Sequence, residues 1–139
     1  MDFTAVLAQI KPKLGCVADN LATIEEQIAK ARGAGADLIV FPELALSGYF
    51  LKDLVPEVAL RINSPEILRL TELSSGISIA IGFVEETDDC HFFNSALYLE
   101  DGAIRHLHRK QHDQSNCISL PGPAVSGINA SKDAGTVLD

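Results

Sequence analysis

Residues 37–49 read DLIVFPELALSGY, and this stretch decides the expected fold. The run from Leu38 to Phe41 is continuously apolar, which is typical of a strand covered on both faces in a mainly parallel sheet. Pro42 interrupts that strand, and a carboxylate, Glu43, follows directly. Open α/β sheets bind their ligands at the carboxyl ends of strands. Glu43 is therefore a candidate functional residue.

Turn residues and the spacing of apolar side chains define the neighbouring elements. They predict a strand at 3–10, a helix at 17–32, a short helix at 51–60, a helix at 64–74, a strand at 77–84, and strands at 94–99 and 103–109 joined by Asp101-Gly102. Asp19 or Asn20 is expected to cap the first helix, and Gly33 or Gly35 to end it. The alternating order predicts an α/β layered fold with helices on at least one sheet face.

Composition and charge exclude several classes of protein. The formal net charge of -8 repels phosphate backbones and anionic lipids, so neither nucleic acid nor a membrane is an expected partner. The start of the chain lacks the pattern of a secretion signal, and a cytoplasmic location is expected. The three cysteines show no CxxC spacing and are expected to be free thiols.

No metal or organic cofactor is expected. His106 and His108 would share one face of a strand, and a metal pair there is the weaker alternative to a solvent-facing edge. The turn at Leu14-Gly15-Cys16 lacks the further glycines of a GxGxxG motif, which argues against a dinucleotide site.

Glu43 has two interpretations on its position alone. A carboxylate at the end of an apolar strand is partly desolvated, which should raise the pKa of Glu43 toward the range useful to a general base. Alternatively, Glu43 caps the next turn or belongs to a structural network.

Four ordered segments resemble the nitrilase superfamily of carbon–nitrogen hydrolases, and together they span roughly residues 3–110. They are VLAQIKPKLGCVADNL, FPELALSGY, IAIGFVEE and FFNSALYLEDGAIRHLHRK. The resemblance implies a layered α-β-β-α sandwich that is incomplete in this chain. Residues 1–110 would form the N-terminal part of the hydrolase domain, and residues 111–139 a divergent, irregular tail. Family members also pair through outer helices and a sheet edge, which implies a homodimer.

The same resemblance implies a catalytic set of cysteine, glutamate and lysine acting on a small-molecule amide or nitrile. It places the glutamate at Glu43 and the lysine at Lys110. No cysteine matches the family's nucleophile, because Cys117 follows Lys110 by only seven residues and lacks the family's acidic and aromatic neighbours. We therefore expect hydrolysis in the complete protein, and an inactive chain if the cysteine segment is missing.

The sequence after Lys110 departs abruptly from the family pattern. Residues 111–114 read QHDQ where the family has an aromatic-Leu-Pro stretch, and a truncation, frame change or altered splice is expected. The competing hypothesis is a non-catalytic α/β binding module in which Glu43 and Lys110 form a structural ion pair. A surface lysine beside Arg109 is the ordinary alternative for Lys110 itself.

Overall fold

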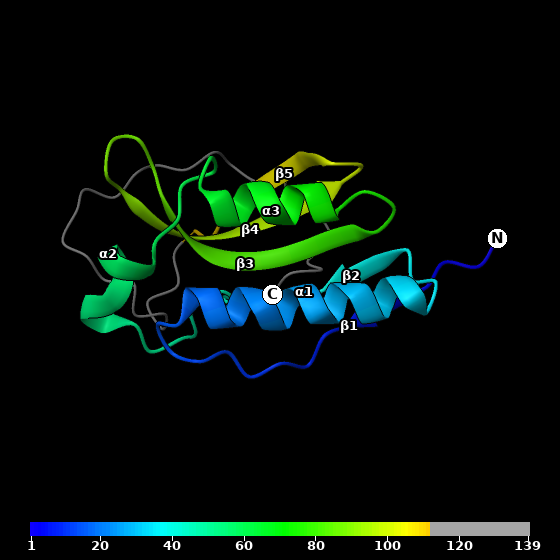
Figure 1. The fold of residues 1–139 in the computed structure, drawn as a ribbon. Helices are drawn as coiled ribbons and strands as arrows, with labels where there is room; N and C mark the ends of the chain where they lie inside the picture. Colours follow the sequence, from blue (N-terminus) through cyan, green and yellow to red (C-terminus); the bar gives the residue numbers. More distant parts are fainter. Residues whose placement is uncertain (112–139) are drawn as a thin grey trace.

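The computed structural model describes residues 1–111 of the chain, which form one five-stranded sheet with helices packed against it (Figure 1). The elements are β1 (Ala5–Leu7), α1 (Val17–Gly33), β2 (Leu38–Val40), the 3-10 helix η1 (Lys52–Leu54), α2 (Val55–Val58), α3 (Pro65–Leu73), β3 (Ser78–Glu86), β4 (Phe92–Glu100) and β5 (Ala103–Arg109). The predicted order of strands and helices is confirmed, although β1 and β2 are shorter than the apolar runs that predicted them.

The sheet is half parallel and half antiparallel. Strands β1, β2 and β3 run parallel, because a helical connection separates each from the next. Strands β3, β4 and β5 are antiparallel neighbours. The β4–β5 turn is formed by Asp101 (φ 51°) and Gly102 (φ 71°), the positive φ pair that a two-residue hairpin requires. The Asp-Gly hairpin predicted from the sequence is therefore confirmed.

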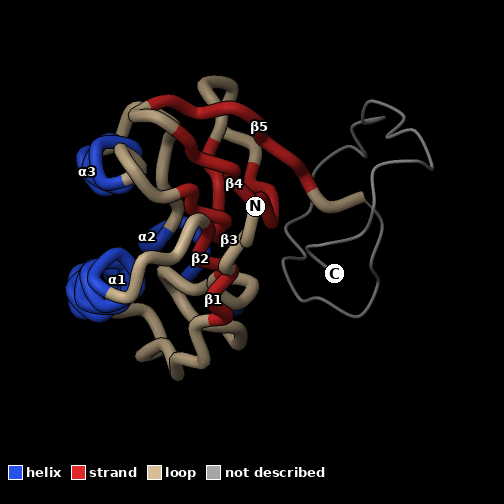
Figure 2. Tube along the Cα trace, turned by 90° about the vertical axis from the view of Figure 1, so that its right-hand side faces the viewer, coloured by secondary structure: helices blue, strands red, loops and turns tan. Residues whose placement is uncertain are grey.

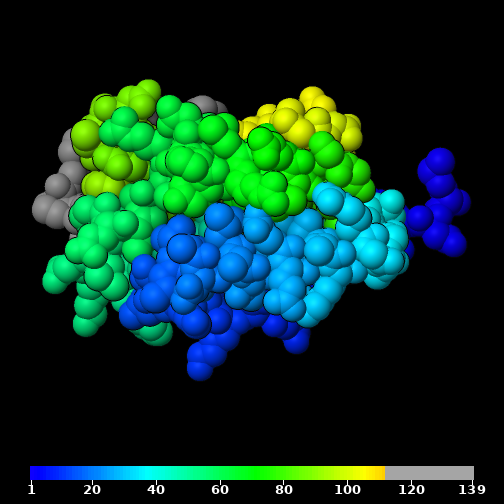
Figure 3. Space-filling model, viewed as in Figure 1, coloured from blue at the N-terminus to red at the C-terminus, as the bar shows by residue number. Residues whose placement is uncertain are grey.

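Helices α1 and α3 lie side by side on one face of the sheet (Figure 2). The apolar side chains of the two helices are fully or almost fully buried against alternate residues of β3 and β4. The helix residues are Ile24, Ile28, Ile67 and Leu70, and the strand residues are Ile79, Ile81, Phe83, Leu97 and Leu99. The space-filling view shows the two helices in continuous contact (Figure 3), and an ion pair between Arg69 and Glu25 joins them at the surface. Side chains alternate along a strand, so residues between those facing the helices point to the other sheet face.

A second, smaller core lies at the carboxyl end of the parallel strands. It joins α2 and η1 to the loop after β2 and to β3, through Leu44, Leu51, Val55, Val58 and Val84. This cluster holds the segment that follows Glu43 against the sheet. Within residues 1–111, no helix combines the length and hydropathy needed to cross a bilayer.

The predicted cap of α1 is wrong, although its predicted end is confirmed. Cys16 precedes the first turn, and no side chain caps it. Asn20 lies inside the helix and is buried, because its side chain makes tertiary hydrogen bonds instead. It accepts a hydrogen bond from the backbone N–H of Lys13 and donates to the backbone oxygens of Lys13 and Leu46. Asn20 thereby ties the helix to the turn after Glu43.

Candidate active site

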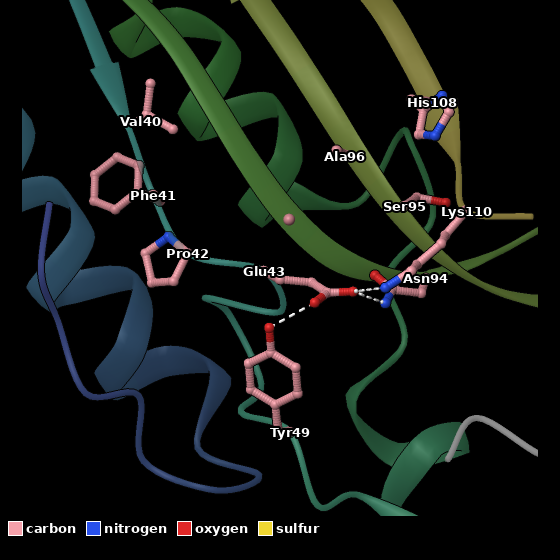
Figure 4. Close-up of a pocket in the computed structure, with 11 residues that line it drawn as sticks. Val40, Phe41, Pro42, Glu43, Tyr49, Asn94, Ser95, Ala96, His108 and Lys110 are labelled. Carbon is pink, nitrogen blue, oxygen red and sulfur yellow. Dashed lines mark hydrogen bonds and ion pairs between the residues drawn. The ribbon is translucent and has the colours of Figure 1, made fainter. Parts of the chain in front are cut away.

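A pocket of about 230 Å³ opens at the carboxyl end of β2 (Figure 4). Its walls come from the end of β2, the following loop, β3, β4 and the end of β5. The lining residues are Val40, Phe41, Pro42, Glu43, Tyr49, Gly82, Asn94, Ser95, Ala96, His108 and Lys110. The pocket therefore lies where the sequence placed a functional carboxylate.

Glu43 and Lys110, the two site residues predicted from the sequence, meet in this pocket. The Nζ of Lys110 lies 3.1 Å from Oε1 of Glu43, and the two side chains are 34% and 27% exposed. The backbone N–H of Lys110 donates to the carbonyl oxygen of Asn94, which extends the β4–β5 pairing by one residue beyond β5. This pairing directs the lysine side chain toward the end of β2.

Both oxygens of the Glu43 carboxylate accept hydrogen bonds. Oε1 accepts from Lys110 and from the side-chain amide of Asn94, and Oε2 accepts from the Tyr49 hydroxyl at 2.6 Å. The close-up shows these donors converging on the carboxylate from the loop after β2, from β4 and from the end of β5 (Figure 4). The carboxylate is thus fixed in one orientation.

The predicted rise in the pKa of Glu43 is wrong. Burial does raise the pKa of Glu43, but hydrogen bonds from Tyr49, Asn94 and Lys110, together with the charge of Lys110, outweigh it. The pKa of Glu43 therefore lies below the ordinary glutamate value of 4.5. At neutral pH the side chain is a carboxylate that can accept a proton.

Tyr49 remains a hydrogen-bond donor over the whole physiological pH range. Partial burial, the hydrogen bond to Glu43 and the negative charge of Glu43 together raise the pKa of Tyr49 to about 12. Its hydroxyl therefore keeps its proton and donates a hydrogen bond to Oε2 of Glu43.

The loop that carries Glu43 passes directly over β3, where only a glycine fits. A Cβ atom on Gly82 would lie 2.8 Å from the backbone nitrogen of Leu44 and 3.0 Å from the Cα of Glu43. Leu44 itself has φ 50°, a conformation that branched and bulky side chains rarely adopt. The position of Glu43 thus depends on a close backbone approach at Gly82.

Sequence reasoning did not assign a role to Asn94 or Gly82, and it noted Tyr49 only as part of the family resemblance. Two signals were available. Asn94 is a polar residue at the start of a mostly apolar strand. Gly82 interrupts a buried strand, which commonly marks a close approach of another backbone.

The cysteines and histidines of residues 1–111 form no catalytic or metal-binding cluster with this pair. Cys16 and Cys90 are exposed, and neither lines the pocket. The rings of His106 and His108 stack at 6.4 Å, and His108 reaches the pocket wall. No group of three or more metal-ligating side chains occurs in this part of the chain. Cys117 lies outside the described residues.

The chain belongs to the carbon-nitrogen hydrolase family, whose family model matches residues 4–133. The match extends beyond Lys110, and the predicted division into 1–110 and 111–139 stays a prediction. Segment 112–139 lies outside the described residues.

Curated relatives of the chain include glutamine-dependent NAD(+) synthetases and an amidase. The glutamine-dependent NAD(+) synthetase of Acinetobacter baylyi is 32% identical over 110 residues, which cover 79% of this chain and 20% of the relative. The enzyme of the same name from Thermotoga maritima is 34% identical over 122 residues, which cover 86% of this chain and 20% of the relative. N-carbamoylputrescine amidase of Solanum tuberosum is 31% identical over 102 residues, which cover 69% of this chain and 34% of the relative. The chain thus spans about a fifth of the length of these synthetases.

Solved structures show the nitrilase-type α/β fold. Glutamine-dependent NAD+ synthetase from Acinetobacter baumannii, in complex with adenosine diphosphate, superposes with a TM-score of 0.67 at 33% identity, covering 79% of this chain and 21% of that one. An N-terminal amidase with a Gln-Gly peptide gives a TM-score of 0.69 at 24% identity, and the match covers 80% of this chain and 28% of the amidase. Residues 1–111 supply one sheet and the helices α1 and α3 of the layered sandwich expected from the sequence.

Proposed function

We propose that this chain supplies the general base, Glu43, and the charge-stabilising lysine, Lys110, of an enzyme that hydrolyses a small-molecule amide. The observation that supports the proposal is the 3.1 Å approach of these two side chains in a pocket at the end of β2. A cysteine thiol supplied from outside residues 1–111 completes the active site.

Each group has a defined part in the reaction. Glu43 takes the proton of the thiol, and the thiolate sulfur attacks the amide carbon. The carbonyl oxygen gains negative charge, which the ammonium of Lys110 stabilises. Protonated Glu43 then gives its proton to the leaving nitrogen, so that ammonia or an amine departs and a thioester remains. Glu43 next deprotonates a water molecule, whose attack on the thioester breaks the carbon–sulfur bond and releases the carboxylic acid. Protonated Glu43 then returns its proton to the sulfur and regenerates the thiol.

An amide is a better substrate class than a nitrile for this chain. The names of its relatives specify glutamine and N-carbamoylputrescine, both of which end in a –CO–NH₂ group, whose carbon–nitrogen bond can be hydrolysed. We therefore propose a primary carboxamide, such as that of glutamine, as the substrate. The proposed partner is this small molecule.

The chain by itself is proposed to be inactive. Neither cysteine in the described part of the chain lines the pocket, and the sequence around Cys117 does not match the family's nucleophile segment. A carboxylate and an ammonium without the thiol would bind the amide but leave the covalent step undone.

Release of ammonia from glutamine tests the proposal, measured on this chain and on a version extended through a family-type cysteine segment. The extended protein should turn over, and Glu43→Gln and Lys110→Ala should each lower its kcat by about 100-fold or more. Lys30→Ala, which removes an exposed lysine paired with Glu26, is the matched control and should retain full activity. Full activity of both pocket variants would refute the proposal.

The second candidate is a non-catalytic α/β module with a structural Glu43–Lys110 pair, favoured by the full set of donors around the carboxylate. In that case Glu43→Gln would chiefly lower the free energy of unfolding. A general base would instead show a large loss of turnover with little loss of stability.

A further inference from the structure

A buried ion pair lies next to the pocket on the helix-facing side of the sheet, and its partner Ser95 also belongs to the pocket wall. Glu85, near the end of β3, is 1% exposed, and its carboxylate accepts three hydrogen bonds. Arg109 donates two of them, from Nε at 2.8 Å and from a terminal nitrogen at 2.7 Å, and the Ser95 hydroxyl donates the third at 2.7 Å. The guanidinium group also lies 4.9 Å from the centre of the Phe93 ring.

This cluster spans three strands. Glu85 pairs with Phe93 in the β3–β4 register, and Ser95 pairs with Arg109 in the β4–β5 register. The ion pair thus reaches across β4 and fastens the last residue of β5 to β3. A guanidinium bound at two nitrogens fixes direction as well as distance, which a single ammonium contact would not do.

Arg109 and Lys110 are adjacent in sequence and project to opposite sheet faces. Arg109 lies on the helix-facing side together with Ser95 and Glu85. Lys110 lies beside Asn94, and the side chains of Lys110 and Asn94 both contact Glu43 on the pocket side. Fixing the side chain of Arg109 on one face therefore fixes the direction of Lys110 on the other.

The register of β5 depends on its pairing with β4, so an ion pair to β3 can stabilise it further. Within residues 1–111, β5 pairs only with β4, and their register shifts between Tyr98 and Leu99. A slip of one residue moves every side chain of a strand to the opposite face. After a slip, the lysine would point toward the helices and away from Glu43.

We propose that Glu85 and Arg109 are positioning residues, whose buried ion pair locks the end of β5 in register so that Lys110 is presented to Glu43. This inference rests on the proposed role of Lys110 in the reaction. A slipped register would separate Arg109 from Glu85 and leave a buried carboxylate without its countercharge. The cost of that buried charge favours the native register.

NMR on the folded chain tests whether the Glu85–Arg109 ion pair fixes the register of β5, and it requires no enzymatic activity. The variant Arg109→Lys keeps the charge but loses the two-nitrogen contact. We expect the Lys110 amide to exchange with solvent roughly tenfold faster, because its hydrogen bond to Asn94 opens more often. The pKa of Glu43 should rise as the ammonium withdraws. Glu85→Gln should give the same two changes more strongly.

The control is a variant that weakens the core elsewhere. Ile28→Val shortens a buried side chain of α1, and it should leave both Lys110 exchange and the pKa of Glu43 unchanged. The proposal is overturned if Arg109→Lys leaves both quantities at their wild-type values, or if Ile28→Val changes them equally. In the extended enzyme, Arg109→Lys should lower kcat with little change in KM. Absence of turnover in the unsubstituted extended enzyme would refute the proposed function, whereas the NMR results would still decide the lock.

Discussion

The ammonium of Lys110 lies 3.1 Å from the carboxylate of Glu43, although 67 residues separate the two in the sequence. The antiparallel β4–β5 pairing brings the end of β5 beside β4, and the loop after β2 carries Glu43 over β3 toward the same place. The hydrogen bond and the charge of Lys110 lower the pKa of Glu43, and the first prediction follows from that interaction.

Lys110→Met should raise the pKa of Glu43, because it removes both a hydrogen bond and a positive charge that lower it. A carbon-13 NMR titration of the Glu43 carboxyl measures the change. Lys30→Met, at an exposed lysine paired with Glu26, should leave that titration unchanged. An identical Glu43 titration in Lys110→Met and wild type would contradict the coupling.

The same substitution should change how stability depends on pH. The folded-state pKa of Glu43 lies below the value of 4.5, so its contribution is complete above that pH. The contribution is lost as the pH falls through the lowered folded-state pKa. Denaturant unfolding at several acidic pH values should therefore show a smaller acid-induced loss in Lys110→Met than in wild type. Equal losses would show that the pair does not stabilise the fold.

Tyr49→Phe removes the donor to Oε2 of Glu43 and keeps the ring. The expected results are a higher pKa for Glu43 and a loss of about 1 kcal/mol in the free energy of unfolding. Carboxyl titration and urea unfolding measure the two effects. Tyr98→Phe, which removes a hydroxyl bonded to Glu100, should leave the pKa of Glu43 unaltered. A Glu43 pKa equal to wild type in Tyr49→Phe would rule out this role for the hydroxyl.

Gly82→Ala should displace the loop that carries Glu43, because the added methyl group would meet the backbone of Leu44 and Glu43. We expect a loss of roughly 1–3 kcal/mol in the free energy of unfolding and a shifted Glu43 carboxyl resonance. Gly33→Ala is the control, since a Cβ at that helical position has no neighbour within 4 Å. The helical substitution should be neutral or stabilising. A Gly82→Ala protein as stable as wild type would contradict the close approach.

Asn20→Ala should cost about 1–3 kcal/mol of stability, because the part-buried backbone groups of Lys13 and the buried carbonyl of Leu46 lose their partner. Thr23→Ala, at an exposed hydroxyl of the same helix, should change the free energy of unfolding by no more than about 0.5 kcal/mol. Thermal and urea unfolding of the two variants provide the comparison. Equal stability of both variants would show that the tie from α1 to the Glu43 loop is not needed.

Local patterns in the sequence were sufficient to predict the order and type of the elements. The helical spacing of Leu21, Ile24 and Ile28, the apolar run of β2 and the Asp101-Gly102 turn each report a preference that nearby residues satisfy. The position of Glu43 after the second strand made it a candidate functional residue, and the family resemblance gave it a catalytic role and added Lys110. The capping role given to Asn20 failed, because a side chain that can cap a helix can equally bind backbone groups brought close by tertiary contacts.

The sequence by itself determined that this is an α/β protein of the carbon–nitrogen hydrolase type, with a carboxylate after the second strand and a lysine after the hairpin. Only the tertiary structure decided the ionisation of Glu43, the need for Gly82 and the fastening of Arg109 by Glu85. The physical reason is distance. Hydrogen bonds, charge interactions and steric contacts act over a few ångströms between segments far apart in the chain, and only folding brings those segments together.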